Sequence, residues 1–319
     1  MKEKIKNYIE KYKMLEKKDK IVLGVSGGKD SICLFHILLD LGYNIEVVHI
    51  NHCIWGDEAM RDQIFVEELC NRNNVNFHLY TYDIPKLSKE TRMSEELVGR
   101  NCRREAFEEV LSKTNAAKIA LAHHKNDRAE TMIFNMCRGA GINGLSSIKS
   151  VNGKYIRPLL AVTRDEINDY IKINNIDYVE DSTNNECKYT RNHVRHNIIK
   201  EMNYINEKSV DNINRTIDNL TEISDFINLE TEKAYRLYVK KYKNGLLIDK
   251  NLIKNTHPML QKTVLRKCIE DIHGNLVNIT EKHILTVIDL FNHGNGKYIC
   301  LPKGIIAKKV NKSVLIYQK

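Results

Sequence analysis

The sequence predicts an α/β fold: a parallel-sheet domain of the Rossmann-like kind, followed by a smaller helical or α+β domain. Short runs rich in Val, Ile and Leu alternate with helical patterns over the first part of the chain, which is typical of βαβ units. A glycine-rich turn follows the first of these runs. The 319 residues suffice for one large and one smaller domain, and we predict domains at 1–210 and 211–319.

Each element follows from its own pattern. The predicted strands are 21–25, 45–50, 77–82 and 118–122, and the helices between them are 31–41, 58–72 and 94–111. A further helix is predicted at 127–138, and a helix after Thr163 begins with a capping box, since Glu166 is its third residue. Residues 206–243 show a polar helical pattern, and 294–319 return to short strands with glycine turns.

The composition narrows the class of protein. No apolar run approaches the roughly 18 residues of a membrane helix, and the N-terminus lacks the apolar segment of a signal peptide. We therefore expect a cytoplasmic protein without a membrane partner. The eight cysteines include no C-x-x-C pair, which disfavours a zinc or iron–sulfur site.

The positive charge is concentrated near the C-terminus. The chain carries a net charge of +9, and residues 240–319 hold fifteen Lys and Arg against five Asp and Glu. A basic region of this kind indicates a polyanionic partner such as RNA. A solvated lysine-rich face explains the same count equally well.

The turn after the first strand reads SGGKDS and has the composition of a phosphate-binding loop. Its residues are Ser26, Gly27, Gly28, Lys29, Asp30 and Ser31. Two glycines allow main-chain N–H groups to approach an anion at a helix N-terminus, and a lysine adds positive charge. A carboxylate beside phosphates requires a cation, so Asp30 indicates Mg²⁺. The loop is not a Walker A motif, because G-x-x-x-x-G-K-[ST] is absent.

This loop resembles the SGGxDS signature of the PP-loop ATP pyrophosphatases, which include GMP synthetase, asparagine synthetase, tRNA thiolases and tRNA(Ile)-lysidine synthase. The resemblance implies an adenine nucleotide alpha hydrolase-like fold and ATP as the cofactor. It also implies cleavage of ATP to AMP and pyrophosphate through an adenylated oxygen.

A second motif, LAHHKNDRAETMIFNMCRGAG, occupies residues 121–141. Asp127 and Glu130 are three residues apart on a predicted helix, so both carboxylates share one face and suit an ammonium group. His123, at the strand end, suits acid–base chemistry or a phosphate. The stretch resembles the G-H-H-x-D-D-Q-x-E-T segment of the tRNA(Ile)-lysidine synthase family. It departs from that segment at Ala122, Asn126 and Arg128.

Two further segments resemble the same family. Arg100 and Arg103 lie in a helix similar to its R-x-x-R-Y helix, with Arg104 in the tyrosine position. The segment 180–196 is similar to its D-x-x-N…Y-x-R-N-x-[IV]-R-H run. Its polar residues are Asp181, Asn184, Arg191, Asn192, Arg195 and His196. Residues 257–304 resemble the family's first C-terminal domain, which suggests the short form of the family or a shortened chain.

The resemblance implies a two-step reaction. ATP adenylates the 2-oxo group of the wobble cytidine in the CAU anticodon of tRNA(Ile), and free L-lysine then displaces AMP to form lysidine. It assigns catalysis to Asp30, Arg103 and His123, with Asp30 also at Mg²⁺, and lysine binding to Asp127 and Glu130. It assigns tRNA binding to Arg191, Asn192, Arg195 and His196. A homodimer is compatible with the sequence.

Three alternatives remain open at this stage. A thiolase of the same superfamily would need paired cysteines or a metal cluster, for which the cysteine spacing gives no support. A paralogue that binds RNA without catalysis is compatible with Arg104, Asn126 and Arg128, although it would not need the ATP loop. A small-molecule amidotransferase would leave the basic C-terminal third unexplained.

Overall fold

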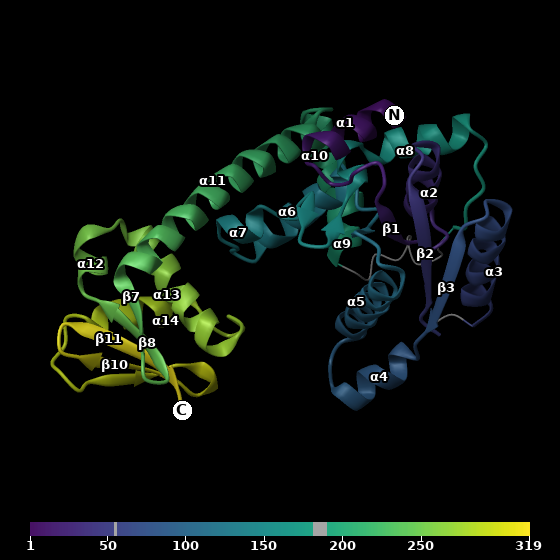
Figure 1. The fold of residues 1–319 in the computed structure, drawn as a ribbon. Coiled ribbons are helices and arrows are strands. Elements are labelled where there is room, and N and C mark those ends of the chain that lie inside the picture. The colour runs from purple at the N-terminus through teal and green to yellow at the C-terminus, as the bar shows by residue number, and fades with distance from the viewer. Residues whose placement is uncertain (54–55, 181–189) are drawn as a thin grey trace. The chain divides into compact units, whose positions relative to one another are not determined.

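The computed structural model describes residues 1–53, 56–180 and 190–319 (Figure 1). The chain divides into two compact units, Met1–Asn219 and Leu220–Lys319, and the division falls within helix α11 (Ser209–Tyr238). Each unit has its own sheet and its own hydrophobic core. The fold class predicted from the sequence is confirmed: a parallel α/β domain precedes a smaller α+β unit.

The first unit is built on a six-stranded sheet in the order β3-β2-β1-β4-β6-β5. The strands are β1 (Lys20–Gly24), β2 (Asn44–Asn51), β3 (Asn76–Thr81), β4 (Lys118–Ala120), β5 (Val151–Asn152) and β6 (Tyr155–Ile156). All neighbouring strands pair in parallel except β5, which is antiparallel to β6. The four predicted strands are confirmed to within two residues at each end.

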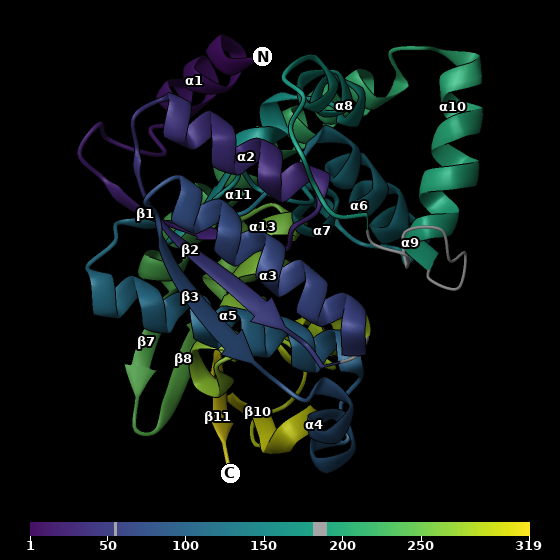
Figure 2. The ribbon, with the colours of Figure 1, turned by 90° about the vertical axis from the view of Figure 1, so that its right-hand side faces the viewer.

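Helices cover both faces of this sheet, because the strand residues that point to either face are apolar. Ile21 and Leu23 of β1 pack into one core with α1 (Lys2–Lys11), α2 (Lys29–Asp40), α3 (Gly56–Arg72) and α8 (Arg164–Ile173). Val22, between them, faces the opposite core under α5 (Glu95–Thr114). Figure 1 shows α3 and α5 on opposite sides of the sheet, and Figure 2 shows α2 and α3 over its strands.

The remaining helices of the first unit connect and flank these layers. They are α4 (Ile84–Thr91), α6 (Lys125–Cys137), α7 (Ile142–Leu145), η1 (Pro158–Ala161), α9 (Thr190–His193), η3 (Val194–Ile198) and α10 (Ile199–Ile205). The predicted capping box of α8 is confirmed, since Thr163 N donates to Glu166 Oε2 at 2.8 Å and Glu166 N donates to Thr163 Oγ1 at 3.3 Å.

The second unit contains an antiparallel sheet in the order β7-β8-β11-β10-β9. Its elements are β7 (Val239–Tyr242), β8 (Gly245–Asp249), α12 (Asn251–Asn255), α13 (Pro258–His273), α14 (Glu281–Leu290), β9 (Tyr298–Cys300), η4 (Pro302–Gly304), β10 (Ile305–Val310) and β11 (Ser313–Gln318). The helix predicted to run to 243 ends at Tyr238, because the next four residues pair with β8. Within the described ranges, no helix is both long and apolar enough to cross a bilayer.

Candidate active site

The loop after β1 is shaped by its main chain and by two serine hydroxyls. Gly27 has a φ of +96°, a conformation that residues with a Cβ rarely adopt. Ser31 Oγ donates to Gly28 O at 2.9 Å and accepts from Ser26 N at 3.2 Å. Helix α2 begins within this loop at Lys29, with Gly28 at its N-cap and no side-chain cap. The first N–H groups of α2 therefore face the loop and can bind an anion.

A segment distant in the sequence closes over this loop. Val179 N donates to Gly27 O at 2.9 Å. The Nζ atom of Lys29 lies 4.7 Å from the centroid of the Tyr178 ring. This cation–π contact holds the lysine side chain beside the loop while leaving its ammonium charge intact.

Asp30 meets the second motif through a buried histidine. His124 is 0% exposed and caps α6, where its Nδ1 accepts from Asp127 N at 3.4 Å. Its other nitrogen, Nε2, lies 3.5 Å from Asp30 Oδ2 and 3.6 Å from Asp127 Oδ2. Asp127 Oδ2 also accepts from His124 N at 3.0 Å, which completes the capping box. One imidazole thus joins the ATP loop to the carboxylate helix.

Asp30 is held in its ionised form by these neighbours. Burial alone would raise the pKa of Asp30, but the hydrogen bond and charge of His124 act in the opposite direction. The charges of Arg164 and Arg195 add to the effect, and the pKa of Asp30 falls below its ordinary 3.8. Asp30 is therefore a carboxylate at neutral pH, as cation binding requires.

Glu130 and Arg195 form a two-point ion pair. Arg195 Nε donates to Glu130 Oε1 at 2.8 Å, and Arg195 Nη2 donates to Glu130 Oε2 at 3.2 Å. Arg195 Nη2 also lies 3.7 Å from Asp127 Oδ1. Glu130 is 3% exposed, whereas the Asp127 side chain is 22% exposed. The structure thus joins two residues that the sequence assigned to different ligands, and leaves Asp127 as the more accessible carboxylate.

Sequence reasoning missed two members of this cluster. It chose His123, whereas His124 makes the contacts to Asp30 and Asp127. Arg164 was also overlooked: its Nη2 lies 3.4 Å from His124 Nε2, and its main-chain N donates to Asn126 Oδ1 at 2.9 Å. The adjacent histidines were a visible signal. Arg164 gave none beyond its place at the start of α8.

The other predicted residues surround this cluster or lie apart from it. His123 follows β4 and is half-buried. Arg103 is exposed on α5. Its charge acts on His52: burial of the His52 ring, together with the charges of Arg103 and His49, lowers the pKa of His52 to about 4.

The segment 180–196, which the sequence predicts to bind RNA, is described only in part. Arg191 belongs to α9, Asn192 is half-buried in the same helix, and His196 is exposed in the following π-helical turn η3. Asp181 and Asn184 lie outside the described residues.

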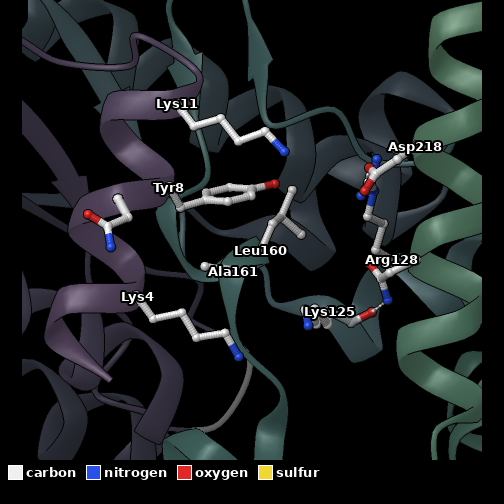
Figure 3. A pocket seen from close by; sticks show the side chains of 10 residues that line it. Lys4, Tyr8, Lys11, Lys125, Arg128, Leu160, Ala161 and Asp218 are labelled. Carbon is white, nitrogen blue, oxygen red and sulfur yellow. Dashed lines mark hydrogen bonds and ion pairs between the residues drawn. The ribbon is translucent and has the colours of Figure 1, made fainter.

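Arg128 points away from the carboxylate face. It is 3% exposed, and its Nη1 donates to Asp218 Oδ1 at 2.6 Å. The two residues help to line a pocket of about 300 Å³, with Tyr8 and Leu160 among its other lining residues (Figure 3). The charge of Arg128, which the family motif lacks, is thus neutralised by Asp218 on the face of α6 opposite Glu130.

Comparisons with known proteins identify the relatives of this chain. Residues 1–202 match the PP-loop domain family. The chain is 38% identical over 325 residues to a tRNA(Ile)-lysidine synthase from Caldanaerobacter subterraneus subsp. tengcongensis, covering 99% of this chain and 69% of that relative. It is 36% identical over 307 residues to one from Clostridium tetani, covering 94% and 66%. The chain therefore spans about two thirds of the length of these relatives.

A solved structure shares the fold of most of the chain. A U34-tRNA thiolase from Methanococcus maripaludis, with its [4Fe-4S] cluster, superposes with a TM-score of 0.59 and 19% identity. The match covers 69% of this chain and 78% of the thiolase. At this identity the likeness concerns the fold alone.

Proposed function

The chain belongs to the tRNA(Ile)-lysidine synthase family, a family of ATP-dependent PP-loop ligases, and we propose that it attaches lysine to the wobble cytidine of tRNA(Ile). The reaction joins the ε-amine of free L-lysine to C2 of the cytidine in the CAU anticodon. ATP is cleaved to AMP and pyrophosphate in the same cycle.

The observation that carries this proposal is the contact of Asp30 and Asp127 with one imidazole. His124 Nε2 lies 3.5 Å from a carboxylate oxygen of Asp30 and 3.6 Å from one of Asp127. An ATP loop alone fits every PP-loop enzyme. An ATP loop coupled to a carboxylate helix fits an enzyme that brings an amine to a carbon whose oxygen has been adenylated.

The first step uses the loop at Ser26–Ser31. The cytidine O2 attacks the α-phosphorus of ATP, the bond to the β-phosphate breaks, and pyrophosphate leaves. The N–H groups at the start of α2 and the Lys29 ammonium suit the charge that develops on the leaving group. Mg²⁺ fits here, because it is commonly held by one or two carboxylates and substrate phosphates, and Asp30 supplies an ionised carboxylate. When bound, the ion would neutralise phosphate charge.

The second step uses α6. The lysine amine attacks C2, the bond from C2 to the adenylated oxygen breaks, and AMP carries that oxygen away. The more accessible Asp127 can hold an ammonium group of the substrate directly, while Glu130 acts with Arg195. Arg103 and His123 are the candidates beside the reacting base, and His123 can take the proton that the amine loses.

The tRNA would be bound by both units. In the first unit we assign Arg191, Asn192 and His196 to the RNA, whereas Arg195 is engaged by Glu130 and orients that carboxylate. In the second unit the basic segment 240–319 would contact phosphates. This division lets one region position the anticodon while the other supplies affinity that does not depend on sequence.

One experiment tests the proposal. The protein is incubated with ATP, radiolabelled lysine and an unmodified tRNA(Ile) transcript bearing CAU, and a transcript bearing UAU serves as the control. We expect label in the first transcript only. Absence of label from both, in a preparation that binds ATP, would reject lysine transfer. Incorporation of sulfur from a persulfide donor instead would favour the thiolase alternative.

A further inference from the structure

We propose that Arg128 is a positioning residue: its ion pair with Asp218 fixes helix α6 against α11 and thereby sets the carboxylates that receive lysine. The inference rests on the proposed function, because it names a residue that tunes the lysine site. At position 128 this chain has arginine, whereas the family motif that the segment resembles has glutamine.

The contact is close and largely buried on one side. Arg128 Nη1 donates to Asp218 Oδ1 at 2.6 Å, and the Arg128 side chain is 4% exposed against 45% for Asp218. Figure 3 shows the two side chains together next to α11, across the pocket from Tyr8. A cation with so little access to water depends on its carboxylate, so the pair constrains the distance between the two helices.

Two further contacts tie the same helices together. Lys125, at the start of α6, forms an ion pair with Asp211 of α11. Asn214 Nδ2 donates to Lys125 O at 3.0 Å and to Val210 O at 2.8 Å. Asp211, Asn214 and Asp218 follow one another at intervals of three and four residues, so they form one stripe along α11. This stripe faces the side of α6 that carries Lys125 and Arg128.

The opposite side of α6 carries the substrate groups. Asp127 precedes Arg128 in the chain, and Glu130 follows it by two residues. A helix is rigid over one turn, so a shift of α6 relative to α11 moves both carboxylates together. Asp127 and its capping partner His124 would move relative to Asp30, and Glu130 would pull against Arg195. A displacement of about 1 Å in the groups that position a substrate is enough to reduce activity strongly.

The test compares Arg128→Gln, Asp218→Asn and the double variant with the wild-type chain. We expect each single change to raise KM for lysine about fivefold with little change in kcat, and the double variant to match the singles. Arg128→Lys keeps the charge and should restore part of the loss. Lys4→Gln is the matched control, because it breaks an exposed ion pair with Glu166 beside the same pocket. KM for ATP should be unchanged throughout.

Hydrogen exchange provides a readout that does not depend on activity. Amides of α6 should exchange faster in Arg128→Gln than in the wild type, while amides of α13 in the second unit keep their rates. Unchanged lysine KM or unchanged α6 protection in a folded variant would overturn the inference. If the wild type transfers no lysine, the proposed function fails, and the exchange of α6 still decides whether Arg128 positions the helix.

Discussion

Arg195 holds Glu130 with two hydrogen bonds, of 2.8 and 3.2 Å, although the two residues are 65 positions apart in the sequence. Their pairing joins α6, which carries the carboxylates proposed to bind lysine, to the segment that the sequence assigns to RNA. Arg195 lies in η3, a π-helical turn, and such turns occur frequently at functional sites. A change in the segment proposed to bind RNA can therefore reach the proposed lysine site through one side chain.

Loss of Arg195 should destabilise the first unit. Arg195→Ala leaves the Glu130 carboxylate buried without its two donors, and we expect a loss of about 3 kcal/mol in the free energy of unfolding. The double variant with Glu130→Gln should lose less, because no charge is then stranded. Urea unfolding of the full chain measures both. Equal losses in the single and double variants would contradict the assigned pairing.

The two glycines of the loop should respond differently to alanine. Gly27→Ala places a Cβ on a residue with a φ of +96°, so we expect a loss of about 1 to 2 kcal/mol. Gly28 has a φ of −71°, and its added Cβ would meet Ser26 Oγ at an ordinary 3.5 Å. Gly28→Ala should therefore unfold like the wild type. A reversed order of stability would show that the loop has another conformation.

His52 should make the stability of the protein depend on pH. Burial, with the charges of Arg103 and His49, lowers the pKa of His52 from 6.5 in the unfolded chain to about 4. Between these values the unfolded chain binds more protons than the folded chain, so the free energy of unfolding falls as the pH falls. Above pH 6.5 the effect is absent. Curves for the wild type and His52→Gln should diverge below this pH; parallel curves would exclude the effect.

Asp30 should be required for AMP formation and not for RNA binding. Asp30→Asn removes the ionised carboxylate of the loop, so AMP release should fall to background while tRNA affinity is retained. Asp40→Asn is a matched control at the far end of α2, where Asp40 pairs with Lys2 at 3.3 Å. Combined loss of AMP release and tRNA binding in Asp30→Asn would point to a structural role for this carboxylate.

The lysines of the second unit should make tRNA binding sensitive to salt. Lys240, Lys241 and Lys243 are exposed in or next to β7. If they contact phosphates, replacing all three with glutamine should reduce the slope of log K against log salt by about 2. Lys309→Gln is unsuitable as a control, because Lys309 is buried and donates to Phe291 O. Exposed Lys233, paired with Glu230, serves instead, and an unchanged slope in the triple variant would favour a solvated face.

The fold could be predicted because its signals are local. Strand β1 was predicted from a short run of apolar residues, whose side chains divide between two cores, and the Thr163–Glu166 capping box marks the start of α8. The loop was identified for the same reason, since SGGKDS is one continuous segment. The predicted end of the helix at 243 was less accurate, because pairing with β8 decides the conformation of residues 239–242.

Contacts between distant residues could not be predicted in this way. Glu130 and Arg128 lie on one helix, yet their partners, Arg195 and Asp218, are 65 and 90 positions away. The choice between His123 and His124 depends on the path of the backbone after β4, which places His124 at the N-cap of α6. Such pairings arise from tertiary packing, and sequence spacing contains no signal for them.

In the proposed reaction, ATP cleavage at the Ser26–Ser31 loop drives the transfer of lysine to one cytidine of tRNA(Ile). The most direct measurement counts AMP, pyrophosphate and tRNA-bound lysine in the same reaction, followed by nuclease digestion and mass analysis of the wobble nucleoside. We predict equal amounts of the three products and a nucleoside whose mass corresponds to cytidine joined to lysine with loss of water. AMP formation without a modified cytidine would contradict the account.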